Sequence, residues 1–136
     1  MRFLLDTNAC ISLLNKFSQP MWRRVRRHAP SDFGISSIVA YELYYGAFKS
    51  QRRDSNVALL DQLAFDVVPF DAGDARTAGA IRSDLETTGR PIGPYDVLIA
   101  AQARTRELLL ITANSREFAR VDGLRWEDWT LQEPAP

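Results

Sequence analysis

Short apolar runs alternate with longer helical stretches along this chain of 136 residues, and this alternation limits the fold more than any other feature. The apolar runs have the length of strands and lie at residues 2–6, 33–36, 66–68, 108–111 and 124–126. The stretches between them have helical spacing and lie at residues 8–16, 20–28, 38–49, 55–64, 72–88 and 94–106, with a short turn near 115–120. Strands that alternate with helices form βαβ units. We therefore predict a three-layer α/β/α domain with a mostly parallel sheet.

The composition is that of one globular domain, with 46% hydrophobic and 25% charged residues, which argues against disorder. We predict a single domain over residues 1–133 and a tail at 134–136. No apolar run approaches the roughly 18 residues of a membrane span, and the N-terminus lacks the pattern of a signal peptide. We therefore expect a cytoplasmic protein that does not contact membranes.

The formal net charge is zero, which excludes a globally basic nucleic-acid binder. All but two of the 17 basic residues are arginine, which binds phosphate bidentately and stacks on bases. A GC-rich genome would produce the same bias. Any RNA contact must come from a local patch, and we expect it at Arg23, Arg24, Arg26 and Arg27; the alternative is a solvated helix face.

Three acidic residues lie near the carboxyl ends of predicted strands, where parallel sheets bind their ligands. Asp6 ends the first strand, Glu42 lies one turn into the helix after the second strand, and Asp96 lies in the first turn of a helix that begins near Pro94. Each has a structural alternative, as a helix cap, a dipole partner or an exposed flank residue. However, all three have apolar neighbours and no adjacent basic residue, and a desolvated carboxylate needs a partner. Converging carboxylates would suit Mg²⁺, or Mn²⁺ in its place.

The chain lacks the residues that several other reactions require. It has one histidine, His28, whereas metal-free ribonucleases that use the 2′-hydroxyl commonly need two. We interpret the single cysteine, Cys10, as a core residue rather than the nucleophile of a thiol dyad. Asn8 stands where a haloacid-dehalogenase-type phosphatase needs a second Asp, and no glycine-rich dinucleotide or phosphate loop is present. Carboxylates and divalent ions instead favour attack by water on phosphorus, which leaves 5′-phosphate and 3′-hydroxyl ends.

Four segments resemble the signature blocks of PIN-domain ribonucleases: LLDTN at 4–8, SSIVAYELYYG at 36–46, PIGPYDVLIAAQAR at 91–104 and ITANSREFARVDGLRWEDW at 111–129. Within that family the chain is most similar to VapC toxins of bacterial toxin–antitoxin pairs. The resemblance implies a parallel five-stranded α/β/α sandwich, with Asp6, Glu42 and Asp96 as metal-binding and catalytic residues. It implies a metal-dependent endoribonuclease that inhibits translation; the alternative is a catalytically silent module that binds RNA or protein.

The fourth position of the family's acidic site departs from its widest pattern. Many members carry Asp where this chain has Asn114, which can orient water or a ligand but adds no charge. Glu117 either supplies the missing carboxylate or forms a capping box with Asn114. We rank Asn114 ahead of Glu117, and Thr112 either contributes its hydroxyl or merely ends a strand. The PIGPYD and REFxxVxGL blocks resemble an enterobacterial VapC subgroup, which implies cleavage of initiator tRNA in the anticodon stem-loop.

Four aromatic residues recur at helical spacing and form one stripe: Tyr41, Tyr44, Tyr45 and Phe48. Packing into the core is the favoured interpretation for most of them. The alternative is a protein interface, because tyrosine hydroxyls prefer a partly wet boundary. The resemblance implies two partners, a second toxin molecule and a VapB-like antitoxin that places an Arg or Lys near the acidic site.

Overall fold

The computed structural model describes residues 1–63 and 65–133. Its five strands are β1 (Phe3–Leu5), β2 (Phe33–Ser36), β3 (Asp66–Val68), β4 (Leu109–Ile111) and β5 (Trp126–Glu127). Its helices are α1 (Thr7–Leu14), α2 (Gln19–Val25), α3 (Ser37–Lys49), α4 (Arg53–Asp61), α5 (Ala72–Thr87), α6 (Pro94–Thr105) and α7 (Ser115–Phe118), with a 3₁₀ turn η1 (Pro30–Asp32). The strands form one sheet in the order β3-β2-β1-β4-β5, and every neighbouring pair is parallel. The α/β prediction is confirmed, and the sheet is wholly rather than mostly parallel.

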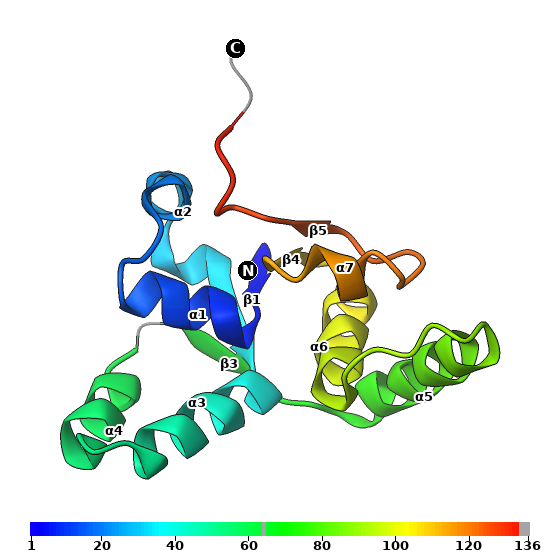
Figure 1. Ribbon diagram of the computed structural model, residues 1–136, viewed down its shortest axis with the longest axis horizontal. Helices are drawn as coiled ribbons and strands as arrows, with labels where there is room; N and C mark the ends of the chain where they lie inside the picture. Colours follow the sequence, from blue (N-terminus) through cyan, green and yellow to red (C-terminus); the bar gives the residue numbers. More distant parts are fainter. Residues whose placement is uncertain (64, 134–136) are drawn as a thin grey trace.

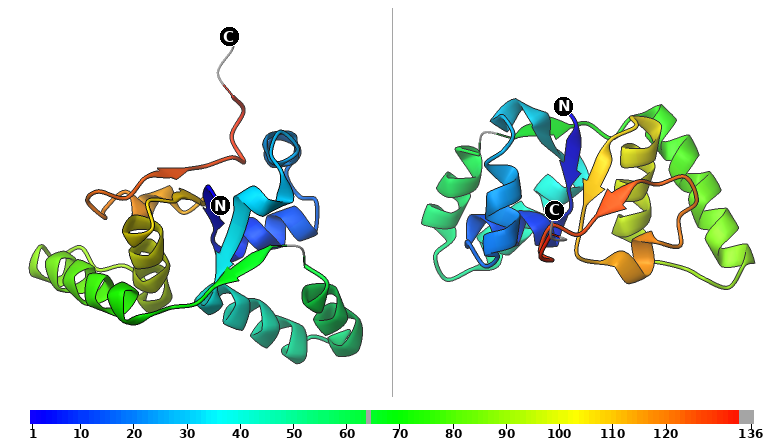
Figure 2. Two further views of the ribbon diagram at one scale, coloured as in Figure 1. Left: turned by 180° about the vertical axis from the view of Figure 1, so that it is seen from behind. Right: turned by 90° about the horizontal axis from the view of Figure 1, so that it is seen from above.

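The order of the strands divides the helices into two layers (Figure 1). The chain moves outward from β1 through β2 to β3, and the helices on this path, α1 to α4, lie on one side of the sheet. It then crosses back to β4 and β5, with α5 to α7 on the other side (Figure 2, right). Right-handed crossovers require this change of side when the direction reverses. The reversal lies between β1 and β4, the place where open α/β sheets bind ligands.

The central strand β1 is buried along its whole length, and the largest fully buried side chains include Phe33, Phe118, Leu4 and Leu5. The sheet therefore provides a rigid base for the residues that leave its carboxyl edge. Side-chain caps begin several helices at this edge, because Asp6, Ser36 and Asp71 accept backbone N–H groups of α1, α3 and α5.

The predicted elements differ from the structure mainly in their bounds. The helix predicted over 20–28 ends at Val25, and the chain then turns before Ala29, which is extended ahead of Pro30. The strand predicted over 124–126 is Trp126–Glu127, because the chain turns at Gly123 with a φ of 78°. The helix predicted over 55–64 is α4, and residue 64 and the tail at 134–136 lie outside the described residues. No helix in the described part of the chain is long and apolar enough to cross a membrane.

Candidate active site

Asp6 leaves the end of β1 beside the end of β4, and its backbone N–H donates to the carbonyl of Ile111. Its side chain is 4% exposed. The Oδ1 atom accepts the N–H of Ala9 at 2.8 Å, and Oδ2 accepts the hydroxyl of Thr112 at 2.5 Å. Burial raises the pKa of Asp6 above its ordinary value, although these two hydrogen bonds oppose the shift. Asp6 is thus both a helix cap and a carboxylate at the strand edge.

Glu42 approaches from α3 on the neighbouring side of the site. Its Oε1 accepts the hydroxyl of Thr7 at 3.0 Å, and its side chain is half-buried. Thr7 directly follows Asp6, so the same short segment carries Asp6 and, through the hydroxyl of Thr7, orients Glu42. The sequence analysis did not single out Thr7; its place after the first strand was the only signal that marked it.

Asp96 and Glu117 form the third part of the site together with Asn114. The amide of Asn114 donates to Glu117 Oε2 at 3.0 Å and to Asp96 Oδ2 at 3.4 Å. Its side chain makes no cap hydrogen bond to α7, so the capping-box alternative for Asn114 and Glu117 is wrong. The side-chain amide of Asn114 instead joins the two acids. The backbone N–H of Asn114 donates to Thr112 Oγ1 at 2.9 Å.

The carboxylates influence one another strongly. Burial raises the pKa of Asp96 to about 7, helped by a hydrogen bond to Glu117 and by the negative charges of Glu117, Asp6 and Glu42. The same hydrogen bond lowers the pKa of Glu117. Of the two carboxyl groups, Asp96 therefore has the higher pKa. These interactions bring all four acids into one electrostatic cluster.

Gly93 completes the cluster, and the sequence analysis, which placed the start of a helix near Pro94, did not single it out. Its backbone hydrogen bond lowers the pKa of Glu117. A Cβ atom at this position would lie 3.2 Å from Asp96 Oδ2 and 3.8 Å from Glu117 Oε2. Glycine therefore leaves room beside both carboxylates, at the beginning of α6.

In the described part of the chain the cluster has no ion pair with a basic side chain, although the charge of Arg120 helps to lower the pKa of Glu117. Within the described residues, no Lys, Arg or His forms an ion pair with Asp6, Glu42, Asp96 or Glu117. No three acidic, histidine or cysteine groups in 1–63 and 65–133 are arranged closely enough to hold a metal as they stand. Threonine hydroxyls and the Asn114 amide hold the acids instead. Carboxylate oxygens are the ligands that a hard divalent cation prefers, and the charge of such a cation would offset the repulsion between these acids and draw them together.

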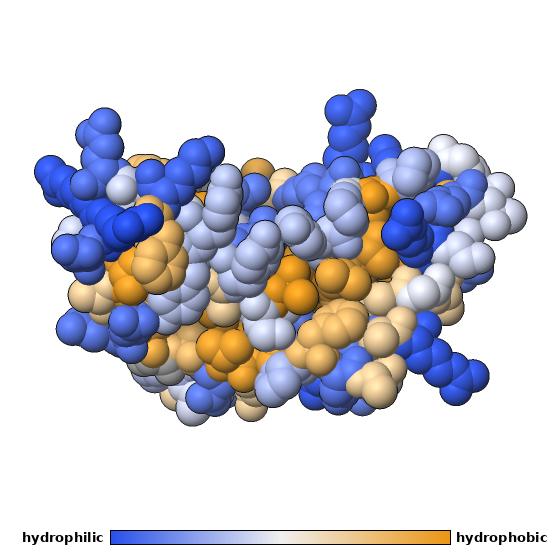
Figure 3. All heavy atoms as spheres, turned by 90° about the horizontal axis from the view of Figure 1, so that it is seen from below, coloured by the Kyte–Doolittle hydropathy of each residue, from blue (hydrophilic) through white to orange (hydrophobic). Residues whose placement is uncertain are grey.

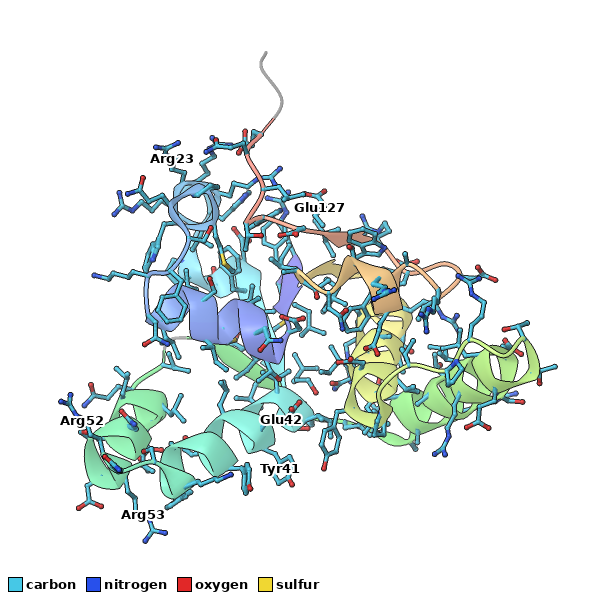
Figure 4. The ribbon with its side chains drawn as sticks, viewed as in Figure 1. Arg23, Tyr41, Glu42, Arg52, Arg53 and Glu127 are labelled. Carbon is cyan, nitrogen blue, oxygen red and sulfur yellow. The ribbon has the colours of Figure 1, made fainter. Side chains whose placement is uncertain are left out.

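Of the arginines predicted to contact RNA, Arg23 and Arg24 lie on α2, and Arg26 and Arg27 follow its end. Figure 4 shows Arg23 far from Glu42, toward the top of the view. Arg24 pairs with Glu133 at 3.1 Å and with Glu127 at 3.7 Å, and Arg27 pairs with Glu133 at 2.7 Å. These acids neutralise part of the patch. Contact of Arg23, Arg24, Arg26 and Arg27 with RNA stays a prediction.

The aromatic stripe on α3 faces solvent rather than the core. Tyr41, Tyr45 and Phe48 are about half exposed, so the favoured packing interpretation is wrong for these three. Tyr44 is half-buried, and its hydroxyl donates to Asp61 at 2.6 Å. A groove of about 300 Å³ between α1, α3 and α4 lies beside the stripe, with Glu42 in its lining. The interface role of the stripe stays a prediction.

Cys10 and His28 lie in separate surroundings. Cys10 is buried in α1, where burial raises the pKa of its thiol. His28 contacts the ring of Phe3 edge-on at 4.6 Å and stacks on Trp129 at 5.8 Å. Both residues are parts of the packing, as the sequence analysis predicted for Cys10.

Comparison with known proteins gives matches over almost the whole chain. The PIN domain model matches residues 3–124. The tRNA(fMet)-specific endonuclease VapC of Shigella flexneri is 42% identical over 132 residues, which cover 96% of this chain and 99% of the relative. The crystal structure of DNA-bound VapBC from Salmonella typhimurium matches with a TM-score of 0.89 and 39% identity, over 95% of this chain and 98% of that chain. VapBC2 from Rickettsia felis, bound to a promoter DNA fragment, matches with a TM-score of 0.87 and 34% identity, over 95% of this chain and 99% of that chain.

Proposed function

The chain belongs to the PIN-domain family and, within it, to the VapC ribonucleases, and from this premise we propose that it is a metal-dependent endoribonuclease toxin that cleaves tRNA. The observation that carries the proposal is the cluster of four carboxylates at the reversal point of the sheet, held in place without a basic partner among the described residues. A chain that needed these acids only for stability would pair them with its own arginines. We place the activity in the cytoplasm, where translation uses tRNA.

Asp6, Glu42 and Asp96 would hold Mg²⁺, or Mn²⁺ in its place, with Glu117 as a further oxygen ligand. When bound, the ion would activate water and offset the negative charge that develops on the phosphate. Asn114 orients Asp96 and Glu117 through its amide, and Thr112 fixes both Asp6 and the backbone of Asn114.

The acids themselves supply the proton transfers. The attacking water forms a bond to phosphorus and loses a proton to a carboxylate, either Glu42 or Asp96. The P–O3′ bond breaks, and the leaving O3′ takes up a proton. The products carry 5′-phosphate and 3′-hydroxyl ends.

Metal dependence is tested with the purified protein and RNA. We expect cleavage with Mg²⁺ or Mn²⁺, none with EDTA, and a loss of at least about 100-fold in Asp6→Asn. Asparagine keeps an oxygen to accept the N–H of Ala9, so this variant should remain folded, as circular dichroism can verify. Robust cleavage by Asp6→Asn would support the alternative of a catalytically silent binding module, with cleavage due to a contaminant.

The proposed target is initiator tRNA, cut in the anticodon stem-loop. Relatives at 42% and 39% identity carry the name tRNA(fMet)-specific endonuclease. Sequencing of the 5′-phosphate ends in cells that express the protein identifies the cut. Cuts confined to another tRNA or to ribosomal RNA would replace this target and leave the nuclease proposal intact.

The proposed protein partner is a VapB-like antitoxin, as in the VapBC structures that resemble this chain. The groove beside Glu42 offers an apolar surface that leads to the acids. An antitoxin arginine or lysine placed there would supply the missing cation and displace the metal. A toxin homodimer is the second proposed contact. Polar substitutions at Tyr44 and Phe48 should weaken antitoxin rescue or dimerisation while cleavage in vitro continues.

A further inference from the structure

Two tyrosines from different helices meet at the rim of the acidic cluster. Tyr41 directly precedes Glu42 on α3, and Tyr95 directly precedes Asp96 on α6. Their ring centroids are 5.8 Å apart at an interplanar angle of 72°, an edge-to-face contact. The two rings therefore hold each other in a fixed arrangement beside the site.

These rings remain open to solvent although they contact each other. Tyr41 is 54% exposed and Tyr95 is 43% exposed. Figure 4 shows Tyr41 and Glu42 next to each other at the beginning of α3, near the middle of the molecule. An aromatic pair fixed in this way presents ring surface to a ligand with little loss of side-chain freedom on binding.

Electrostatics at this place disfavours recognition of RNA through its phosphates alone. Four carboxylates lie beside the pair, and the arginines of α2 lie elsewhere on the molecule. On the face seen from below, hydrophilic residues gather mainly at the two ends, and the middle is largely neutral or hydrophobic (Figure 3). Stacking on an aromatic ring requires no positive charge, and it is the usual way in which proteins hold unpaired bases.

We propose that Tyr41 and Tyr95 bind an unpaired nucleobase of the RNA next to the bond that is cut. The inference rests on the proposed ribonuclease activity and adds the element that selects single-stranded RNA. It accounts for an aromatic pair that joins two helices where their acids converge. The remaining exposed aromatics on α3, Tyr45 and Phe48, lie further along the helix, and among the described residues neither forms a ring pair with Tyr95.

Binding is measured in the Asp6→Asn background, so that the RNA stays intact. The probe is a short single-stranded RNA that contains 2-aminopurine, whose fluorescence falls when the base stacks. We expect Tyr41→Leu and Tyr95→Leu each to weaken binding by roughly 5- to 100-fold and to lessen the quenching. Phenylalanine at either position should restore both signals, because it keeps the ring.

Tyr45→Leu is the matched control, since Tyr45 is 58% exposed and lies one turn from Tyr41 on the same helix. We expect its affinity for the probe to stay within about twofold of the parent. A fully paired RNA duplex should bind the parent, Tyr41→Leu and Tyr95→Leu equally, because its bases are not free to stack.

Three results would overturn the proposal: unchanged binding in both leucine variants, no recovery with phenylalanine, or an equal loss in Tyr45→Leu. A change of oligomeric state in Tyr41→Leu and Tyr95→Leu, measured by light scattering, with unaltered RNA affinity would assign the pair to a protein interface. Failure of the metal-loaded parent to cleave any RNA would reject the proposed function. Affinity and fluorescence quenching are measured without cleavage, so they test the role of the tyrosine pair independently of the test for ribonuclease activity.

Discussion

Two groups of acids lie beyond the carboxyl ends of strands in this molecule, and they differ in whether a basic side chain pairs with them. Asp74 is the third residue of α5, and Asp96 is the third residue of α6. Arg106 reaches Asp74 Oδ2 at 2.8 Å and Asp71 Oδ2 at 3.3 Å. No basic side chain in the described residues pairs with Asp96 or its neighbours.

The pKa values of acids in the two groups also differ. The pKa of Asp71 is lowered by the backbone N–H of Asp74 and further by the charge of Arg106. The pKa of Asp96 is raised to about 7, first by burial and then by its acidic neighbours. Acids at equivalent helix positions are thus structural where the chain supplies a cation. Where it supplies none, they remain available to a ligand.

Removal of Arg106 should have the largest effect on stability. Arg106→Met leaves Asp74, which is fully buried, without its cation, so we expect a loss of roughly 2–4 kcal/mol in the free energy of unfolding. Urea denaturation followed by circular dichroism measures it. Arg82→Met is the control, because Arg82 forms an exposed pair with Glu86 that is worth at most about 0.5 kcal/mol. An equal effect of the two substitutions would contradict the structural role of the Arg106 cluster.

Substitution of Asp96 should act on stability in the opposite direction. In EDTA at pH 7, Asp96→Asn removes a group that is costly to ionise, and we expect a gain of roughly 1–2 kcal/mol after allowance for solvent screening. The same variant should lose RNA cleavage. Asp71→Asn, in the paired cluster, should destabilise the protein. If Asp96→Asn is less stable than the parent, the carboxylate contributes to the fold and the contrast between the clusters fails.

The stability of the metal-free protein should depend on pH because of Asp96. Its pKa is about 7 in the folded chain and about 3.9 when unfolded, so the folded state binds more protons between these values. This contribution to stability is fully present below about pH 4 and is lost as the pH rises through 7. The difference between the parent and Asp96→Asn should therefore grow from pH 4 to pH 7.5. Thermal melts across this range in EDTA measure it, and a constant difference would contradict the raised pKa.

The sequence predicted the elements well because their signals are local. Apolar runs and helical spacing located all five strands, and the rule for strand ends selected Asp6, Glu42 and Asp96. The errors concern contacts over long distances in the chain. Whether Asn114 caps α7 or joins Asp96 to Glu117 depends on how α6 lies against α7, which no local pattern contains.

Long separation in the sequence is also the reason why other contacts in both clusters were not predicted. Thr112 bonds to Asp6 across 106 residues, and Arg106 reaches Asp74 across 32 residues. These contacts follow from the order of the strands, which the sequence alone did not provide. The exposed aromatic stripe was misjudged because helical spacing shows that residues share a face but does not show what covers that face.

The smallest expected effect belongs to Gly93. In Gly93→Ala the added Cβ would lie 3.2 Å from Asp96 Oδ2, so that side chain must shift by a few tenths of an ångström. The φ of −55° and ψ of 145° suit alanine, so the backbone is not strained. We expect the Mg²⁺ concentration for half-maximal cleavage to rise roughly two- to fivefold, equivalent to less than about 1 kcal/mol.

Gly79→Ala is the control for this change, because nothing lies within 4 Å of a Cβ at Gly79 in α5. It should gain roughly 0.5–1 kcal/mol of stability from the helix propensity of alanine and leave the Mg²⁺ requirement unchanged. The comparison separates the space beside the unpaired acids from a general effect of a methyl group on a helix. Identical Mg²⁺ titrations for Gly93→Ala and the parent would show that the carboxylates adjust without cost. Neither the backbone angles nor the space beside the acids would then require glycine at this position.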